Sequence, residues 1–414
     1  MTGARVSAGR PRGVDTAGAV WTVAVFTAVL VVVGHWLFLR VALIGDEPIH
    51  LSQVLRFVRG EGGMHPWLTT FPTFHWLASW IVRALGSEST STVRLASTML
   101  GILVVPAAWF VARARFDRAV SRARAFGVAF LPILVPYFFF IYTDAAALAA
   151  LLAAVAAAER RRWLLAGAFG LLAVALRQTA IVWVAWLFAQ YLWNERPWLA
   201  WRADGVRRLR EASLFVATGI AFVAFVVLNR GIAIGDSSSH PLGVYDQNLL
   251  FFLVVVALLL LPAMLLEARA TWAMIRRKPV VWMIVAGVAA AWFQFGWNAD
   301  HPYNLLPYHL HNDVAMWLND AMHRACVTPF AVWGLLTLCR LSRADFPTIS
   351  WAVATVLTLV PSWMIEHRYA IVPLALWLLL RPAASATTER AQLAWLVVLG
   401  AGSLWVSTLA PYGL

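Results

Sequence analysis

The sequence predicts an all-helical protein that crosses a lipid bilayer many times. Hydrophobic residues make up 61% of the 414 positions, charged residues make up 13%, and the mean hydropathy is +0.73. This composition is typical of polytopic membrane proteins and excludes an ordinary soluble globule. The apolar residues also fall in long runs separated by short arginine-rich segments. The net charge of +13 therefore indicates membrane-flanking loops, and binding to nucleic acid is not expected.

The first elements are a basic arm and a long apolar run. Residues 1–18 are expected to be a disordered cytoplasmic arm, and residues 19–414 a single membrane domain. The apolar run at 19–44 is long enough to cross the hydrocarbon core as a helix. It lacks an obvious small-residue cleavage site, so we expect it to remain as the first span.

A large external loop is predicted at residues 44–92. Within it, the segment 68–86 is apolar, but Pro72, His75 and several tryptophans interrupt it. Tryptophan at this density favours an amphipathic helix in the headgroup layer, or a re-entrant element, over a membrane-crossing helix.

Arginine clusters define the two faces of the membrane. The clusters at 113–124, 160–162, 196–210 and 276–278 are best placed in the cytoplasm, which puts the N-terminus inside and the C-terminus outside. Thirteen spans are then predicted, near residues 19–44, 94–112, 125–142, 145–158, 163–176, 179–194, 212–230, 249–266, 280–297, 324–340, 347–364, 370–381 and 391–409.

The polar motifs fall on one face in this topology. Polar residues that converge on one side of a helical bundle indicate a single cavity there. The motifs are Asp46-Glu47, Tyr142-Thr143-Asp144, Arg177-Gln178, Gly235-Asp236 to His240, His301 to Asp313, and Glu366-His367-Arg368-Tyr369.

Each motif also has a structural explanation. Adjacent carboxylates at 46 and 47 could be a solvated helix end, and Asp144 could cap a helix. Arg177 could extend its charge to the interface, or it could bind a phosphate with help from Gln178. Glu366 and Arg368 lie between two apolar spans, so they must be paired or used in chemistry.

A histidine-rich stretch raises the question of a metal. The residues His301, His309, His311, Asp313 and His323 have spacings that match no closed zinc motif. No metal or other cofactor is therefore assigned, and a divalent cation stays a disfavoured alternative.

Several motifs together resemble the eukaryotic alpha-1,2-glucosyltransferases that use dolichyl-phosphate glucose to add the terminal glucose of the lipid-linked oligosaccharide. The resemblance covers about residues 44–375, and the ordered set is more specific than any single piece. The matching pieces are Asp46-Glu47 with His50 and Gln53, Leu68-Thr69-Thr70 with Pro72, Tyr142-Thr143-Asp144, Arg177-Gln178-Thr179, Gly235-Asp236 with Ser239-His240, His301-Pro302-Tyr303, and Glu366 with Arg368-Tyr369 and Pro373.

The resemblance implies the GT-C architecture, an active site on the external face, and an acidic residue of the first external loop as catalytic base. We expect Asp46 to be that base, with Glu47 second. A departing lipid phosphate needs cationic donors, for which Arg368 and Arg177 are the candidates, aided by Gln178 and Tyr369. Residues expected to bind the sugar or the acceptor are His50, Gln53, Thr70, Asp144, Asp236, His240, His301 and Glu366.

The predicted function is therefore inverting transfer of a hexose, with glucose favoured, from a polyprenyl-phosphate sugar to a glycan or glycolipid at the external membrane face. Transfer of mannose, arabinose or another sugar is the first alternative, and transport of a lipid-linked sugar is the second. Lys278 is the only lysine in an alanine- and arginine-rich chain, which is typical of a GC-rich bacterial genome. We accordingly expect a bacterial plasma membrane, or the endoplasmic reticulum if the protein is eukaryotic.

Overall fold

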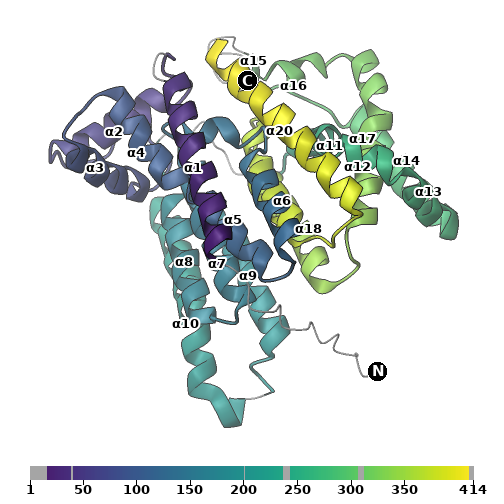
Figure 1. The fold of residues 1–414 in the computed structure, drawn as a ribbon, viewed down its shortest axis with the longest axis horizontal. Helices are drawn as coiled ribbons and strands as arrows, with labels where there is room; N and C mark the ends of the chain where they lie inside the picture. The colour runs from purple at the N-terminus through teal and green to yellow at the C-terminus, as the bar shows by residue number, and fades with distance from the viewer. Residues whose placement is uncertain (1–15, 39–40, 200, 236–242, 306–311, 410–414) are drawn as a thin grey trace.

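The computed structural model describes residues 16–38, 41–199, 201–235, 243–305 and 312–409, and every regular element in these ranges is a helix (Figure 1). The all-helical prediction is confirmed. The first five helices are α1 (Thr16–Phe38), α2 (Glu47–Val58), α3 (Thr73–Leu85), α4 (Thr90–Gly101) and α5 (Val104–Arg113).

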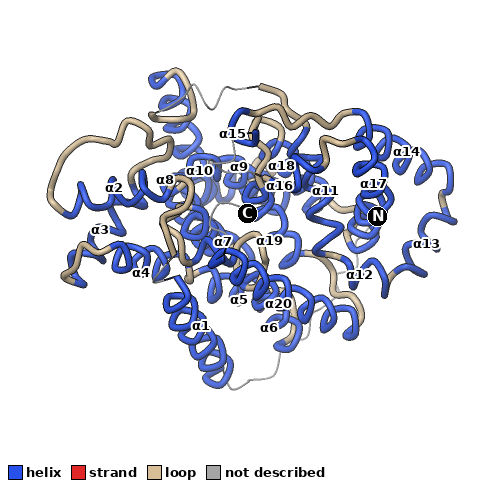
Figure 2. Tube along the Cα trace, turned by 90° about the horizontal axis from the view of Figure 1, so that it is seen from above, coloured by secondary structure: helices blue, strands red, loops and turns tan. Residues whose placement is uncertain are grey.

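The central part of the chain packs around α7 (Asp144–Glu159), which lies near the middle of the molecule in Figure 2. Fourteen of its sixteen residues are buried, and most of them are alanines, whose small side chains allow α5 and α8 to approach closely. The other elements of this part are α6 (Arg118–Ala129), η1 (Val135–Phe138), α8 (Trp163–Leu176), η2 (Gln178–Ala180), α9 (Ile181–Glu195) and α10 (Trp201–Asn229).

The C-terminal part lies beside this centre and ends in the long helix α20 (Figure 1). Its elements are α11 (Gln247–Leu259), α12 (Leu261–Leu266), α13 (Ala268–Arg277), α14 (Pro279–Phe295), α15 (Pro302–Leu305), α16 (Asp313–Trp317), α17 (Ala321–Leu341), α18 (Phe346–Leu359), η3 (His367–Ala370), α19 (Ile371–Leu380) and α20 (Ala386–Leu409).

Four helical segments in the described ranges are long and apolar enough to cross a membrane, and the bent pair of α13 and α14 would make a fifth. The four are Thr90–Arg113, Asp204–Asn229, Ala321–Leu341 and Ala386–Leu409. Five further apolar helices in the described ranges are shorter. The protein is thus an integral membrane protein, and the count of thirteen spans stays a prediction.

The segment 125–142 does not form the single helix that its apolar character predicts. Helix α6 ends at Ala129, and the chain continues through turns and the short 3-10 helix η1. Pro132 and Pro136 explain the break, because proline lacks an amide hydrogen and disfavours helix in the residue before it. The irregular stretch places Tyr142 beside Asp46. The Tyr142 hydroxyl accepts a hydrogen bond from the Asp46 backbone amide.

The segment 68–86 contains the amphipathic helix α3. Phe74, Ala78 and Val82, spaced four residues apart, are fully buried, whereas Trp76 and Trp80 are 49% and 58% exposed. The amphipathic character predicted for this segment is confirmed. Its position in the headgroup layer remains a prediction.

Candidate active site

Asp46 is presented by a tight turn that leads into α2. Gly45 has φ +53°, a left-handed conformation that favours glycine, and the Asp46 backbone amide donates to the Tyr142 hydroxyl at 2.9 Å. The Asp46 side chain is 43% exposed, and its Oδ2 lies 3.9 Å from Nη1 of Arg368. Asp46 is therefore a carboxylate with an open face and one cationic neighbour.

Glu47 is fully buried and fully paired. Its two carboxylate oxygens bind the Arg94 guanidinium at 2.7 and 3.1 Å and also accept the backbone amides of Ile44 and Ile141. This bidentate contact leaves Glu47 without an open face. The structure thus separates the two adjacent carboxylates, and Asp46 alone remains a candidate for the base.

Arg368 belongs to η3, which follows an irregular segment at 360–366. Asn248 and Asn304 hold this segment, because the Asn248 amide donates to the carbonyls of Ser362 and Met364, and Asn304 exchanges two hydrogen bonds with Ile365. The Arg368 Nε donates to Oε2 of the buried Glu366. The Arg368 guanidinium is thereby held in place at the end of the segment 360–366, which the two asparagines fix.

Arg177 lies between α8 and η2. Its Nη1 donates to Oδ2 of Asp144 at 2.8 Å and to the Thr143 hydroxyl at 3.2 Å. The neighbouring Gln178 donates to the carbonyls of Thr69 and Ile232 at 2.6 and 3.1 Å. Gln178 therefore joins the first loop to the segment that follows α10.

These segments enclose a cavity of about 160 Å³. It contains an acid, two arginines, an imidazole and hydroxyl groups, and aromatic side chains form part of its wall. Its lining includes seven of the predicted residues, namely Asp46, His50, Thr70, Arg177, Gln178, Arg368 and Tyr369, together with the unpredicted Thr69, Ser362 and Trp363.

A smaller hollow of about 40 Å³ adjoins this cavity, since both are lined by Arg177, Arg368 and Tyr369. Asp144 lies at its wall, and the remaining lining is largely apolar. The two arginines therefore border both the polar cavity and a largely apolar recess.

Burial shifts the pKa of two groups at the site, His50 and Glu366. Burial lowers the pKa of His50 to about 3, and the positive charges of Arg368 and Arg177 act in the same direction. His50 is thus neutral at physiological pH, and its Nδ1 shares a hydrogen bond with Nε2 of His75 at 2.8 Å. Burial raises the pKa of Glu366 to about 7, although Arg368 opposes this rise.

Other predicted residues lie away from the cavity lining. Gln53 is fully buried and accepts the His65 amide at 2.6 Å, so it orders the loop after α2. His301 is buried beside Trp363, a residue of the cavity lining, with ring centroids 4.5 Å apart. Asp236 and His240 lie outside the described residues.

Two sequence signals were available for residues that the prediction missed. Pro361, near the end of the expected span 347–364, disfavours helix. The residues that follow it, Ser362 and Trp363, are therefore non-helical and line the cavity. Arg94 inside an otherwise apolar segment required a buried partner, which is Glu47.

Within the described ranges, no three His, Cys, Asp or Glu side chains converge in a way that could hold a metal ion. Asp144 and Glu366, two carboxylates near the cavity, are paired with Arg177 and Arg368. These residues offer two cationic groups and a carboxylate to an anionic, hydroxyl-bearing ligand.

The model of the DIE2/ALG10 family matches residues 42–197 and 196–379. Curated relatives named Dol-P-Glc:Glc(2)Man(9)GlcNAc(2)-PP-Dol alpha-1,2-glucosyltransferase are each 25% identical to the chain. The match with the Arabidopsis thaliana relative covers 52% of this chain and 41% of the relative. The match with the Homo sapiens relative covers 39% of this chain and 36% of the relative. The match with the Kluyveromyces lactis relative covers 80% of this chain and 72% of the relative. The matches therefore span less than half of the plant and human proteins.

Among solved structures, ArnT from Cupriavidus metallidurans bound to undecaprenyl phosphate aligns with a TM-score of 0.43 and 14% identity. The alignment covers 96% of this chain and 77% of that one. The two family-model matches together extend over most of the sequence and include the described residues that line the cavity. The chain belongs to the DIE2/ALG10 family.

Proposed function

We propose that the protein is an inverting glycosyltransferase that moves a hexose from a polyprenyl-phosphate sugar to a hydroxyl of a glycan or glycolipid. The observation that carries the proposal is the open Asp46 carboxylate in a cavity bordered by Arg368 and Arg177. Membership of the DIE2/ALG10 family supports it. Glucose is the favoured sugar because the relatives are named as Dol-P-Glc glucosyltransferases.

In the proposed reaction, Asp46 takes the proton of the acceptor hydroxyl as that oxygen attacks the anomeric carbon. The bond between the anomeric carbon and the phosphate oxygen breaks at the same time, and its electron pair stays on the phosphate. Attack from the face opposite the leaving group inverts the anomeric configuration. Because the leaving group departs as a phosphate anion, no strong general acid is required.

Arg368 and Arg177 are proposed to stabilise the charge that grows on the departing phosphate. Both also border the apolar recess beside Leu148, Leu151 and Trp183, which suits the first isoprene units of a lipid donor. Neutral His50 and the hydroxyl of Thr70 are suited to hydrogen bonds with sugar hydroxyls, and Trp363 offers an apolar face to a sugar ring.

The membrane setting of this reaction is also a proposal. Asp46 and His50 of the cavity lining lie at the start of α2, in the segment expected at the external face, and the arginine-rich loops are expected in the cytoplasm. We therefore place the reaction at the external face of a plasma membrane that supplies both the donor and a glycan or glycolipid acceptor.

The test is a transfer assay with purified protein in nanodiscs, offered radiolabelled polyprenyl-phosphate glucose, mannose or arabinose and extracted envelope glycolipids. Asp46→Asn should reduce transfer by at least about a hundredfold, because loss of a positioned base typically costs that much. Glu61→Gln is the matched control, since Glu61 is a 48% exposed carboxylate of the same loop and does not line the cavity.

Retention of transfer in Asp46→Asn would disprove the assignment of the base. Transfer that depends on Asp46 but prefers mannose or arabinose would reassign the donor sugar. No transfer from any donor by the folded wild-type protein would contradict the enzymatic proposal.

A further inference from the structure

A second cavity lies far from the candidate active site. It has a volume of about 530 Å³ and lies between α13, the start of α14 and the end of α17. Figures 1 and 2 show α13 and α14 at one edge of the molecule and α2 and α3 at the opposite edge. The cavity is therefore separate from the groups assigned to sugar transfer.

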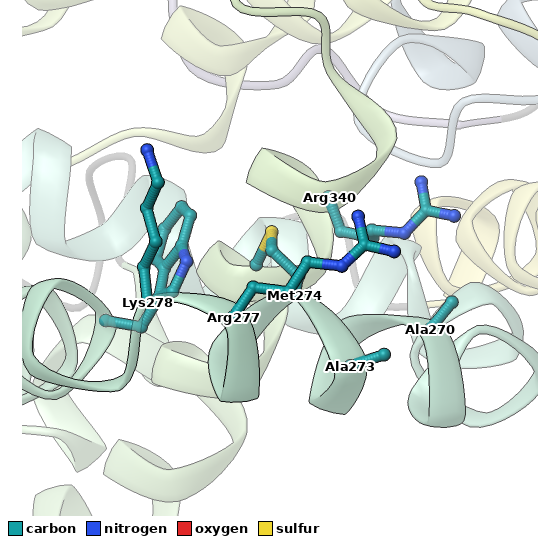
Figure 3. Close-up of a pocket in the computed structure, with 7 residues that line it drawn as sticks. Ala270, Ala273, Met274, Arg277, Lys278 and Arg340 are labelled. Atoms are coloured by element: carbon teal, nitrogen blue, oxygen red, sulfur yellow. The ribbon is translucent and has the colours of Figure 1, made fainter.

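Three cationic side chains border this cavity, namely Arg277, Lys278 and Arg340. In Figure 3, Arg277 and Arg340 extend on one side of Met274, and Lys278 stands on the other side. All three residues are exposed, and none of the three side chains has a hydrogen bond or ion pair with another described residue. Three like charges around one hollow without a protein anion create a field that attracts an anionic ligand.

The floor of the cavity differs chemically from its rim. Ala270, Ala273 and Met274 provide apolar surface, and the Trp282 indole forms part of the wall. A site for a free inorganic ion needs no such floor. Cations above an apolar surface, next to tryptophan, are typical of the level at which lipid headgroups meet acyl chains.

The bend between α13 and α14 supports the same occupant. The two helices turn by 113° at Lys278, where Pro279 begins α14. Helix α14 then presents an apolar outer face. The exposed residues of this face are Val280, Val281, Met283, Ile284 and Val288, which are 50–63% exposed. Acyl chains descending from a headgroup in the cavity would cover this face.

We propose that the hollow of Arg277, Lys278, Trp282 and Arg340 is a binding site for the phosphate headgroup of an anionic membrane phospholipid. The two guanidinium groups bind the phosphate oxygens and the ammonium group supplies a third charge. The apolar floor receives the glycerol backbone, and the acyl chains lie along α14.

Native mass spectrometry of the full-length protein in detergent tests this site, with phosphatidylglycerol or phosphatidylcholine added in increasing amounts. The test variant carries Arg277→Gln, Lys278→Gln and Arg340→Gln. The control variant carries Arg210→Gln, Arg276→Gln and Arg390→Gln, which removes the same charge from exposed positions outside the cavity.

Wild type and control should each retain one phosphatidylglycerol, and the test variant should bind it at least about tenfold more weakly. Phosphatidylcholine should bind equally weakly to all three proteins. Equal phosphatidylglycerol binding by the test variant and wild type would overturn the proposal. Equal loss in both triple variants would show a general charge effect and would also overturn it.

A competition arm with inorganic phosphate separates a lipid site from an anion site. Millimolar inorganic phosphate should leave phosphatidylglycerol bound to the wild type, because it cannot replace the apolar contacts. Complete displacement would show an adventitious ion site only. Thermal unfolding without lipid checks the fold, and Arg340→Gln alone, on α17, should weaken binding by a smaller factor if the triple variant unfolds early.

Discussion

Asp46 and Glu47 are adjacent in sequence but have opposite environments. Asp46 is 43% exposed, with one guanidinium at 3.9 Å, whereas Glu47 is fully buried and accepts four hydrogen bonds. A carboxylate whose oxygens already accept hydrogen bonds from arginine and backbone amides cannot take a proton from a substrate. The local environments therefore leave Asp46 available for the proposed chemistry, whereas Glu47 has a structural role.

Glu366 should make donor binding depend on pH. Burial raises its pKa to about 7, so it is mostly protonated below pH 7 and mostly ionised above it. Ionised Glu366 neutralises Arg368 and repels an incoming phosphate, while protonated Glu366 leaves the guanidinium free to bind it. The KM for a polyprenyl-phosphate sugar should therefore rise as pH increases from 6 to 8, by about threefold to tenfold.

Glu366→Gln is the variant that isolates this effect, because it keeps the shape and removes the titration. Its KM should be low and nearly constant over the same pH range, measured by initial rates at varied donor concentration. A wild-type KM that does not change with pH would contradict the proposed coupling, as would an unchanged pH dependence in the variant.

At the scale of helices, α2 is positioned by the buried pair of Glu47 and Arg94. The Arg94 guanidinium also donates to the carbonyls of Phe38, Val41 and Ala42, so one side chain of α4 holds the end of α1, the connecting turn and the start of α2. The turn that presents Asp46 lies directly beside these contacts of Arg94.

Removing one member of the Glu47–Arg94 pair should destabilise the protein. Glu47→Gln leaves the Arg94 charge buried without its carboxylate, which should lower the free energy of unfolding by about 3 kcal/mol. Thermal unfolding in detergent measures the loss. Glu88→Gln is the matched control, because its partner Arg59 and Glu88 itself are 53% and 45% exposed, and such surface pairs contribute less than about 1 kcal/mol. Equal effects of the two substitutions would contradict the structural role of Glu47.

Helix type was predictable from the sequence, but helix boundaries and partners were less so. Apolar runs predicted helices, and the tryptophans, Pro72 and His75 that interrupt 68–86 predicted an amphipathic helix there, since both properties are local. Breaks at Pro132, Pro136 and Pro361 were visible as residues, yet a hydropathy window averages over them. The role of Gln53 was not predictable, because its partner His65 is supplied by a loop that folds back over α2.

At the scale of the whole molecule, the candidate site joins four segments that are distant in sequence. The first loop, the α8–α9 junction, the chain after α10 and the loop before α19 all contribute to one cavity wall. The ordered set of polar motifs in the sequence indicated most of the polar residues that line this cavity. It could not indicate which would pair, because Arg177 with Asp144 and Arg368 with Glu366 are defined by helix packing.

The contact between the first loop and the chain after α10 requires a glycine. The amides of Ile234 and Gly235 donate to the carbonyls of Thr69 and Leu68 at 3.2 and 3.0 Å. A Cβ atom at position 235 would lie only 2.3 Å from the Pro66 carbonyl oxygen, so the two segments would have to separate. Thr69 and Thr70 would then move with the cavity wall.

Gly235→Ala should therefore impair transfer without unfolding the helical core. We expect kcat/KM to fall by about tenfold or more, since small displacements of binding groups are costly to positioned reactions. Gly231→Ala is the matched control, because a Cβ atom at position 231 would meet no other atom within 4 Å and the substitution leaves the contact intact. Hydrogen exchange of the amides of Ile234 and Gly235 should accelerate only in Gly235→Ala. Normal exchange and activity in that variant would mean that the wall tolerates the extra methyl group and that this contact does not set the geometry of the site.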